Sequence, residues 1–225
     1  MAEVFDCADS SQLLAAARAA RQAIGRGDLV VLPTDTVYGV GADAFSPEAV
    51  TKLLEAKGRG RQSPPPVLIP DLATLGALAA DANDAVRGLA DRFWPGALTM
   101  NLFANPSLSW DLGDTGGTVA LRMPDQPLTL ELLRETGPLA VSSANATGEP
   151  AARAVADAER MLGESVAVYL DAGETPGDGT PSTIIDATRL TVEGGTVRVL
   201  REGGVSRDTL AAVLTEIAPD AIIED

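Results

Sequence analysis

Residues 57–61 read Lys-Gly-Arg-Gly-Arg and place three cations within five positions of a chain whose formal net charge is −15. The sequence contains only two lysines, Lys52 and Lys57, and one of them stands in this stretch. Arginine binds phosphate oxygens bidentately, and lysine adds a point charge. We therefore expect residues 57–63, called the cation loop below, to hold an anion such as a nucleotide polyphosphate. The spacing does not fit a Walker A loop. The competing interpretation is a solvated charge run at a helix end.

Two further segments are rich in small polar residues, and each contains or follows a short apolar strand. They are residues 33–41, Pro-Thr-Asp-Thr-Val-Tyr-Gly-Val-Gly, and residues 141–148, Val-Ser-Ser-Ala-Asn-Ala-Thr-Gly. Ligands in α/β folds usually bind at the carboxyl ends of strands, and turns of this kind can form an anion-binding nest. An ordinary capped turn is the competing interpretation for both. Arg122 and Arg201 each end a predicted strand, which makes a convergent anion site more plausible than either arginine alone.

The composition excludes several kinds of chemistry. The sequence has no histidine and one cysteine, which rules out histidine-dependent triads and an intramolecular disulfide and argues strongly against a zinc site. No apolar run approaches the roughly 18 residues that a membrane span needs, and the N-terminus does not resemble a signal peptide. We therefore expect a soluble, cytoplasmic protein. Its 32 acidic and 17 basic residues make unaided binding to RNA unfavourable.

Helical and strand patterns alternate along the chain, which indicates one α/β domain with a twisted mixed parallel/antiparallel sheet flanked by helices. Ser10 or Ser11 is expected to cap a first helix that ends near residue 25. We expect the domain to span residues 8–217 and residues 218–225 to form a C-terminal tail that frays. The other expected helices are 47–56, 72–80, 83–93, 128–135, 154–162 and 207–214, and the expected strands are 29–32, 67–69, 98–103, 118–122, 139–141, 166–170, 183–186 and 197–200.

Taken together, several segments in this order resemble the YrdC-like threonylcarbamoyl-AMP synthase family, in its single-domain bacterial form. The resemblance runs from about Ala15 to Leu214. Each segment alone is a weak signal, but the ordered set is specific. The segments are residues 33–41, 57–59, 94–99, 119–124, 143–145 and 181–183.

The resemblance implies a YrdC-like fold and a nucleotidyltransferase activity. Such an enzyme makes threonylcarbamoyl-AMP and pyrophosphate from L-threonine, bicarbonate and ATP, and Mg²⁺ is expected to accompany the ATP. Downstream proteins then transfer the threonylcarbamoyl group to adenosine next to the anticodon of certain tRNAs. Little direct contact with tRNA is expected of the synthase itself, and the family pattern assigns no metal ligand in this chain.

The family pattern also implies roles for individual residues. Lys57 and Arg59 would be the catalytic cations that hold the ATP phosphates. The other implied ATP-binding residues are Ser63, Thr99, Val141, Ser143, Asn145, Ala151 and Arg201, and the implied threonine-binding residues are Thr36, Arg122 and Ser182. Four positions depart from the family pattern, namely Gly60, Ser63, Leu68 and Gln126, and the role of Arg61 is left open.

The implied reaction needs no protein nucleophile, because a carbamate formed from threonine and bicarbonate attacks the α-phosphorus and pyrophosphate leaves. The protein has to align anions and stabilise developing charge, and closure of the cation loop would protect the carbamate from water. One alternative is a catalytically silent YrdC-like protein that binds nucleotide or RNA. Another is a related carbamoyl-adenylating enzyme of hydrogenase maturation, although that context normally adds further domains and cysteine-rich segments.

Overall fold

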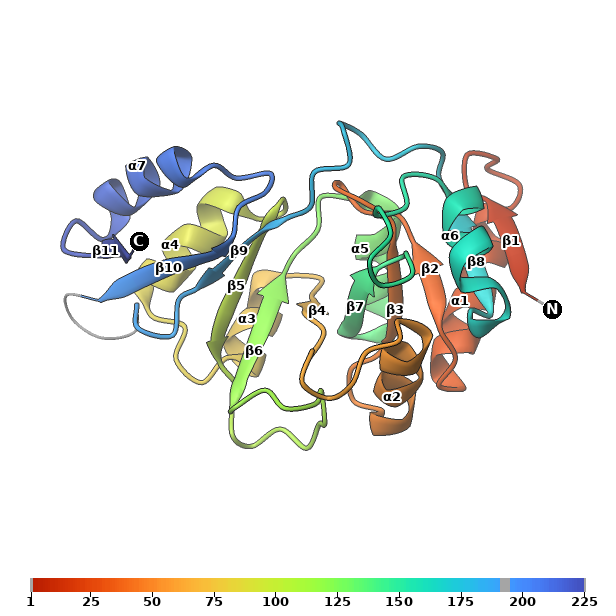
Figure 1. Ribbon diagram of the computed structural model, residues 1–225, viewed down its shortest axis with the longest axis horizontal. Coiled ribbons are helices and arrows are strands. Elements are labelled where there is room, and N and C mark those ends of the chain that lie inside the picture. The colour runs from red at the N-terminus through yellow and green to blue at the C-terminus, as the bar shows by residue number, and fades with distance from the viewer. Residues whose placement is uncertain (1, 191–194, 225) are drawn as a thin grey trace.

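An 11-stranded sheet runs through the whole molecule, with helices on both of its faces (Figure 1). The computed structural model describes residues 2–190 and 195–224. The strand order is β1-β8-β2-β3-β7-β4-β6-β5-β9-β10-β11, and the pairs are partly parallel and partly antiparallel. This arrangement confirms the predicted α/β class with a mixed sheet. No helix in residues 2–190 and 195–224 is long and apolar enough to cross a membrane.

The strands are short, and most of them occur where the sequence predicts them. β5 (Leu98–Phe103), β6 (Thr118–Arg122) and β9 (Thr183–Asp186) have the predicted bounds. The others are β1 (Glu3–Asp6), β2 (Val30–Leu32), β3 (Gly39–Asp43), β4 (Val67–Leu68), β7 (Leu139–Ser143), β8 (Val168–Asp171), β10 (Thr196–Arg201) and β11 (Ile222–Glu224).

The helices also follow the predicted pattern within a few residues. They are α1 (Leu13–Gly25), α2 (Pro47–Ala56), α3 (Leu72–Leu78), α4 (Asp84–Phe93), α5 (Pro127–Thr136), α6 (Val155–Leu162) and α7 (Arg207–Ile217), with a 3₁₀ turn at Gly163–Ser165.

The two N-terminal helices show where cap prediction succeeds and fails. The Ser46 hydroxyl caps α2 by accepting from the Ala49 N–H, as predicted. The predicted cap of α1 is wrong, because α1 starts after Gln12 and has no side-chain cap. The Ser11 hydroxyl instead donates to Asp9, 2.7 Å away, in a local turn that precedes the helix.

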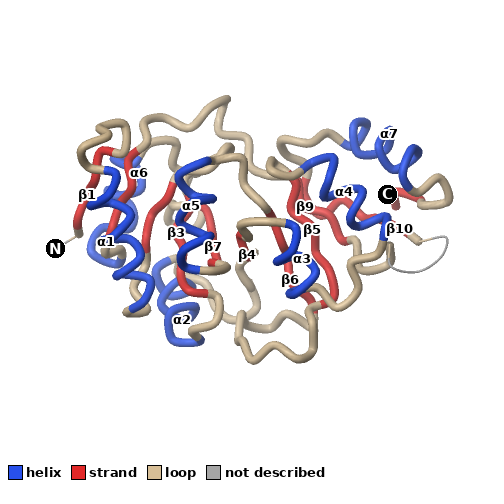
Figure 2. The backbone as a smooth tube through the Cα atoms, turned by 180° about the vertical axis from the view of Figure 1, so that it is seen from behind, coloured by secondary structure: helices blue, strands red, loops and turns tan. Residues whose placement is uncertain are grey.

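Strand β2 is buried on both faces, which explains its continuous apolar sequence. Val30 and Leu32 pack in a cluster with residues of α1 and α5, whereas Val31 belongs to the larger core cluster on the opposite face. Over this half of the sheet, α2 and α6 lie on the near face in Figure 1, and α1 and α5 lie on the near face in Figure 2. Side chains that alternate along each strand therefore meet helices on both sides.

Three strands were not predicted. β3 begins inside the predicted segment 33–41 and ends at Asp43, and the sequence does not indicate it because two glycines give it a low strand propensity. Residues 3–6 pair in parallel with β8, and residues 222–224 pair in parallel with β10. The sheet therefore includes a strand beyond each of the predicted domain limits, 8 and 217, and the expected fraying tail contains a paired strand.

Candidate active site

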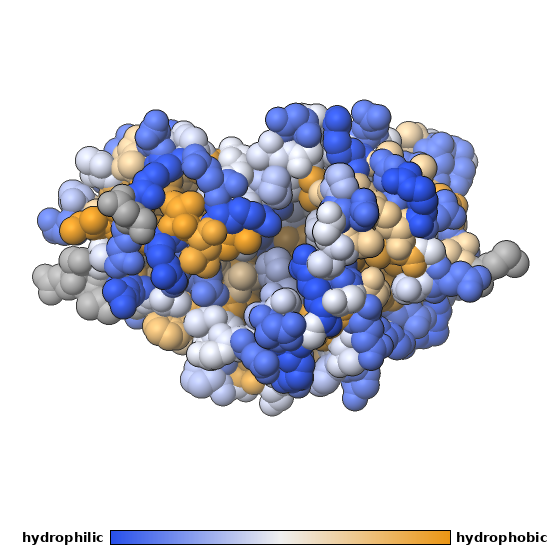
Figure 3. Space-filling view, viewed as in Figure 1, coloured by the Kyte–Doolittle hydropathy of each residue, from blue (hydrophilic) through white to orange (hydrophobic). Residues whose placement is uncertain are grey.

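A cavity of about 420 Å³ opens near the middle of the sheet. Segments far apart in the sequence line it, including the β2–β3 turn, β4, the starts of β5 and β9, and the ends of β6, β7 and β10. Figure 3 shows a hollow near the centre of the face, between the half that carries α4 and α7 and the half that carries α2 and α6. The predicted site residues that line it are Thr36, Arg59, Thr99, Arg122, Val141, Ser143, Asn145, Ala151, Ser182 and Arg201.

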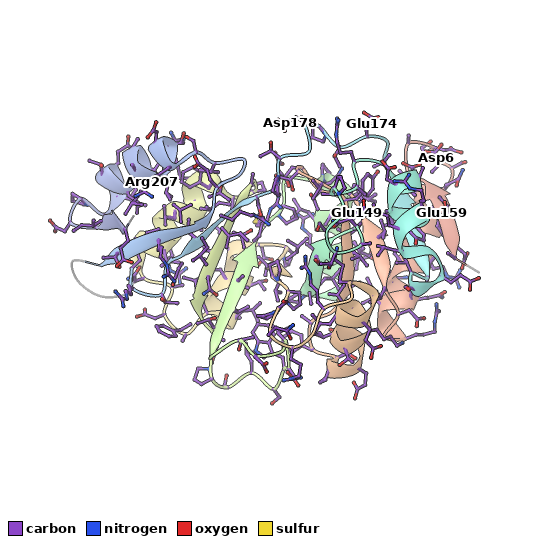
Figure 4. All side chains as sticks on the ribbon, viewed as in Figure 1. Asp6, Glu149, Glu159, Glu174, Asp178 and Arg207 are labelled. Carbon is purple, nitrogen blue, oxygen red and sulfur yellow. The ribbon has the colours of Figure 1, made fainter. Side chains whose placement is uncertain are left out.

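Three arginines make this cavity locally positive in a strongly acidic protein. Arg59 comes from the cation loop, Arg122 from the end of β6 and Arg201 from the end of β10. Among the described residues that line the cavity, Glu149 is the only carboxylate. It lies on the loop between β7 and α6 (Figure 4). The cavity therefore suits a ligand with several negative charges.

Arg122 is the most constrained of the three arginines. Its Nε donates to the Gly96 carbonyl at 2.9 Å, its Nη1 to the Thr36 hydroxyl at 3.0 Å, and its Nη2 to Asp35 Oδ1 at 2.6 Å. Burial lowers the pKa of Arg122, and the neighbouring Asp35 carboxylate acts in the opposite direction. Arginine stays protonated in proteins despite such shifts, so a fixed guanidinium faces the cavity.

Paired hydroxyls line two walls of the cavity. Thr34 and Thr36 lie 3.0 Å apart through their Oγ1 atoms, and the Thr34 hydroxyl also donates to the Val37 carbonyl, 2.6 Å away, which closes the β2–β3 turn. On the other half of the sheet, Thr99 and Ser182 lie 2.9 Å apart through their hydroxyl oxygens. The Arg201 guanidinium donates to the Ser182 carbonyl at 2.7 Å and so covers this pair.

Lys57 does not line the cavity, unlike Arg59, Arg122 and Arg201. Its side chain is only 2% exposed, and its Nζ donates to the Ser143 carbonyl at 2.5 Å, to the Asn145 side-chain oxygen at 2.8 Å and to the Asn145 carbonyl. Burial, followed by the charge of Arg59, lowers the pKa of Lys57 to about 8. Three oxygen acceptors match the three N–H groups of an ammonium. Lys57 thus fixes the turn that follows β7.

The cation loop is attached on two sides. The Arg59 guanidinium donates to the Thr147 hydroxyl at 3.2 Å and to the Ser142 hydroxyl at 3.3 Å. Arg61 does not line the cavity and pairs with Asp111. Ser63, an expected nucleotide contact, does not line the cavity either, and its backbone N–H bonds to the Gly60 carbonyl within the loop.

Several residues that line the cavity were not singled out from the sequence. Thr34 and Tyr38 lie in the segment 33–41, which the sequence predicts to contact a ligand, although it assigns no role to these two residues. The Tyr38 hydroxyl donates to the Gly173 carbonyl at 2.6 Å, and burial raises the pKa of Tyr38 to about 12. Glu149 carries no local signal, because a single acid in a loop is common. Of the atypical positions, Leu68 lines the cavity, whereas Gln126 caps α5.

Known proteins resemble this chain over most of its length. The family model described as "Telomere recombination", which covers the Sua5, YciO and YrdC proteins, matches residues 22–203. The chain belongs to the Sua5/YciO/YrdC family. A Mycobacterium tuberculosis relative of this family, named a putative threonylcarbamoyl-AMP synthase, is 51% identical over 214 residues, which cover 95% of this chain and 96% of that protein.

Two other members of the Sua5/YciO/YrdC family extend beyond the matched region. The Bacillus subtilis threonylcarbamoyl-AMP synthase is 39% identical over 88% of this chain and 56% of its own length. The crystal structure of P. abyssi Sua5 complexed with L-threonine is 32% identical and has a TM-score of 0.82. The match covers all of this chain and 62% of that chain. The match to P. abyssi Sua5 therefore spans every segment of this chain that lines the cavity.

Proposed function

We propose that this protein is an L-threonylcarbamoyladenylate synthase that uses L-threonine, bicarbonate and ATP and releases pyrophosphate. The observation that carries the proposal is the convergence of Arg59, Arg122 and Arg201 on one cavity, together with two hydroxyl pairs. Relatives that carry this activity in their names are up to 51% identical to the chain over nearly its whole length. The cavity volume lies within the range that is typical of small-molecule sites.

The two sets of polar groups suit the two larger substrates. Arg122 and Thr36 would bind the threonine carboxylate, and the relative whose structure contains L-threonine supports this choice of amino acid. Arg59, Ser143 and Asn145 would hold the ATP phosphates, with Thr99 and Arg201 on the nucleotide side. Lys57 would act through the turn at residues 143–145 and not by direct contact, because its ammonium is already bonded there.

The chemistry then depends on alignment and charge. The threonine carbamate attacks the α-phosphorus, and fixed cations stabilise the charge that develops as pyrophosphate leaves. Mg²⁺ would arrive with the nucleotide, because it retains water and binds mainly through phosphates when few carboxylates are available. Glu149 is the one carboxylate among the described lining residues, and no cluster suited to a metal ion occurs in residues 2–190 and 195–224.

The proposal also includes the cellular location of the enzyme and the proteins that use its product. It places the enzyme in the cytoplasm, where downstream threonylcarbamoyl-transfer proteins collect the unstable product for tRNA modification.

Pyrophosphate release tests the proposed function directly. Purified protein with ATP, Mg²⁺, L-threonine and bicarbonate should release pyrophosphate, and omission of threonine or bicarbonate should each abolish the release. Release that needs no threonine would contradict the proposal, and release that needs carbamoyl phosphate in place of threonine and bicarbonate would indicate a different carbamoyl-adenylating enzyme. No release under any condition, with ATP binding retained, would indicate the catalytically silent alternative.

A further inference from the structure

The loop between β5 and β6 makes a specific contact with the cation loop. Residues 110–114 of this loop, called the platform below, lie against Arg61. The Arg61 guanidinium bonds bidentately to Asp111, with Nη1–Oδ2 and Nη2–Oδ1 distances of 2.9 and 2.8 Å. Its Nε lies 3.4 Å from Asp114 Oδ1. A bidentate fork fixes direction as well as distance.

A backbone hydrogen bond joins the two loops as well as the ion pair. The Asp114 N–H donates to the Arg61 carbonyl at 2.8 Å. A Cβ atom on Gly113 would lie 2.6 Å from the Arg61 carbonyl oxygen, a distance that real Cβ atoms essentially never show. Gly113 also has a φ of +104°, which disfavours any side chain. Only glycine at this position allows the two backbones to approach so closely.

The platform is itself firmly anchored. Leu112 is 2% exposed and belongs to the main core cluster. The Trp110 ring stacks on Phe45 with a centroid separation of 5.5 Å, and Phe45 lies directly before α2, the helix that delivers the cation loop. The platform is therefore held by the core and by the segment that precedes α2.

We propose that the platform positions the cation loop for catalysis, with Gly113 and Arg61 as positioning residues that act through Arg59. Thr147 and Ser142 hold the loop at Arg59, and the platform holds it two residues later. A shift at Arg61 would move the Arg59 guanidinium relative to the nucleotide phosphates. This proposal rests on the proposed function, because it assumes that Arg59 binds ATP.

A matched pair of glycine substitutions separates positioning from general strain. Gly117 lies in the same loop with a φ of +83°, but no atom lies within 4 Å of its would-be Cβ. Gly117→Ala should therefore cost backbone strain without disturbing the cation loop. Gly113→Ala should lower kcat/KM for ATP about tenfold more than Gly117→Ala does, since a displacement of about 1 Å can cost up to a hundredfold in rate. The KM for threonine should change little in either variant.

The same samples distinguish the possible outcomes. Hydrogen–deuterium exchange of the cation-loop amides should increase in Gly113→Ala and not in Gly117→Ala. Equal kinetics and equal exchange in the two variants would overturn the proposal. If the wild-type protein releases no pyrophosphate, the proposed function fails, but the exchange comparison still decides whether the platform orders the loop. Should Gly113→Ala not fold, Arg61→Gln keeps the backbone contact and should show a smaller change in the same direction, and no change in it would likewise count against the proposal.

Discussion

At the scale of single residues, the proposed function depends on how Arg122 is held before a ligand binds. Three of its five N–H groups are used by Gly96, Thr36 and Asp35, and two remain for an incoming carboxylate. The Asp35 side chain is 15% exposed and that of Arg122 is 8% exposed, so the pair is nearly buried. Loss of either partner would leave an uncompensated charge in a poorly solvated site.

Arg122→Lys should therefore weaken threonine binding specifically. One ammonium cannot reproduce the planar fork, so we expect the KM for threonine to rise at least about tenfold, or roughly 1.4 kcal/mol. The KM for ATP should change much less. Arg134→Lys, at the C-terminal end of α5 and outside the cavity, is the control and should match the wild type. Equal losses of affinity for both substrates would contradict the proposal that Arg122 binds the threonine carboxylate.

The lowered pKa of Lys57 leads us to expect that nucleotide binding depends on pH. Its ammonium satisfies three acceptors in the turn at residues 143–145, and its pKa is lowered to about 8. As the pH rises through about 8, the amine loses a proton and one donor, so the turn loosens and ATP affinity should fall. ATP itself is fully ionised in this range. Calorimetric titration from pH 7.5 to 9.5 would measure the fall, and Lys57→Met should bind weakly at every pH without this slope.

At the scale of elements, β3 and β7 are packed with almost no spare space beside the cavity. Gly39 and Gly41 face Val141, which lines the cavity, and their would-be Cβ atoms lie 2.6 and 3.2 Å from its methyl groups. Two glycines in a strand usually weaken it. Here they allow a branched side chain of β7 to occupy the space where their own side chains would be.

Gly39→Ala should lower the free energy of unfolding by about 2 kcal/mol, because overpacking forces the strands apart. The double variant Gly39→Ala/Val141→Ala should have a free energy of unfolding about 1 kcal/mol higher than the sum of the two single effects predicts. The reason is that Val141→Ala removes the methyl groups that clash with the new side chain at residue 39. Urea denaturation of the single and double variants measures this coupling. Gly25→Ala at the end of α1, where no atom lies within 4 Å, serves as the control and should cost nothing. Additive effects at residues 39 and 141 would show that the two do not share one space.

This packing also explains which elements the sequence could predict. Helix α2 carries its own cap, proline and first-turn acid, so local residues determine its start. The strand β3 has no such signal, because only its distant neighbour Val141 makes two glycines suitable there. The same distinction holds at the site. The residue types at 57, 59, 122 and 201 indicated an anion site, but the direction of the Lys57 side chain depends on carbonyl groups 86 to 88 positions away.

At the scale of the whole molecule, three arginines line one cavity of a strongly acidic protein. Outside it, many of the described cations are paired with acids, as in Arg21–Glu135, Arg61–Asp111 and Arg198–Asp186. These exposed pairs contribute little stability, but they neutralise the groups that would otherwise attract a phosphate backbone. A protein of net charge −15 therefore presents few unpaired cations to a large polyanion, even though its cavity suits a small one.

This charge distribution predicts that tRNA does not bind stably to the isolated protein. Binding of a nucleic acid draws most of its affinity from released counterions, and paired arginines release few. We expect filter retention of labelled tRNA to indicate a Kd weaker than about 10⁻⁴ M at physiological salt. ATP should still bind under the same conditions, which serves as the control for folded protein. Micromolar retention of tRNA with a steep salt dependence would require a basic surface beyond the cavity, and it would favour the RNA-binding alternative to the synthase.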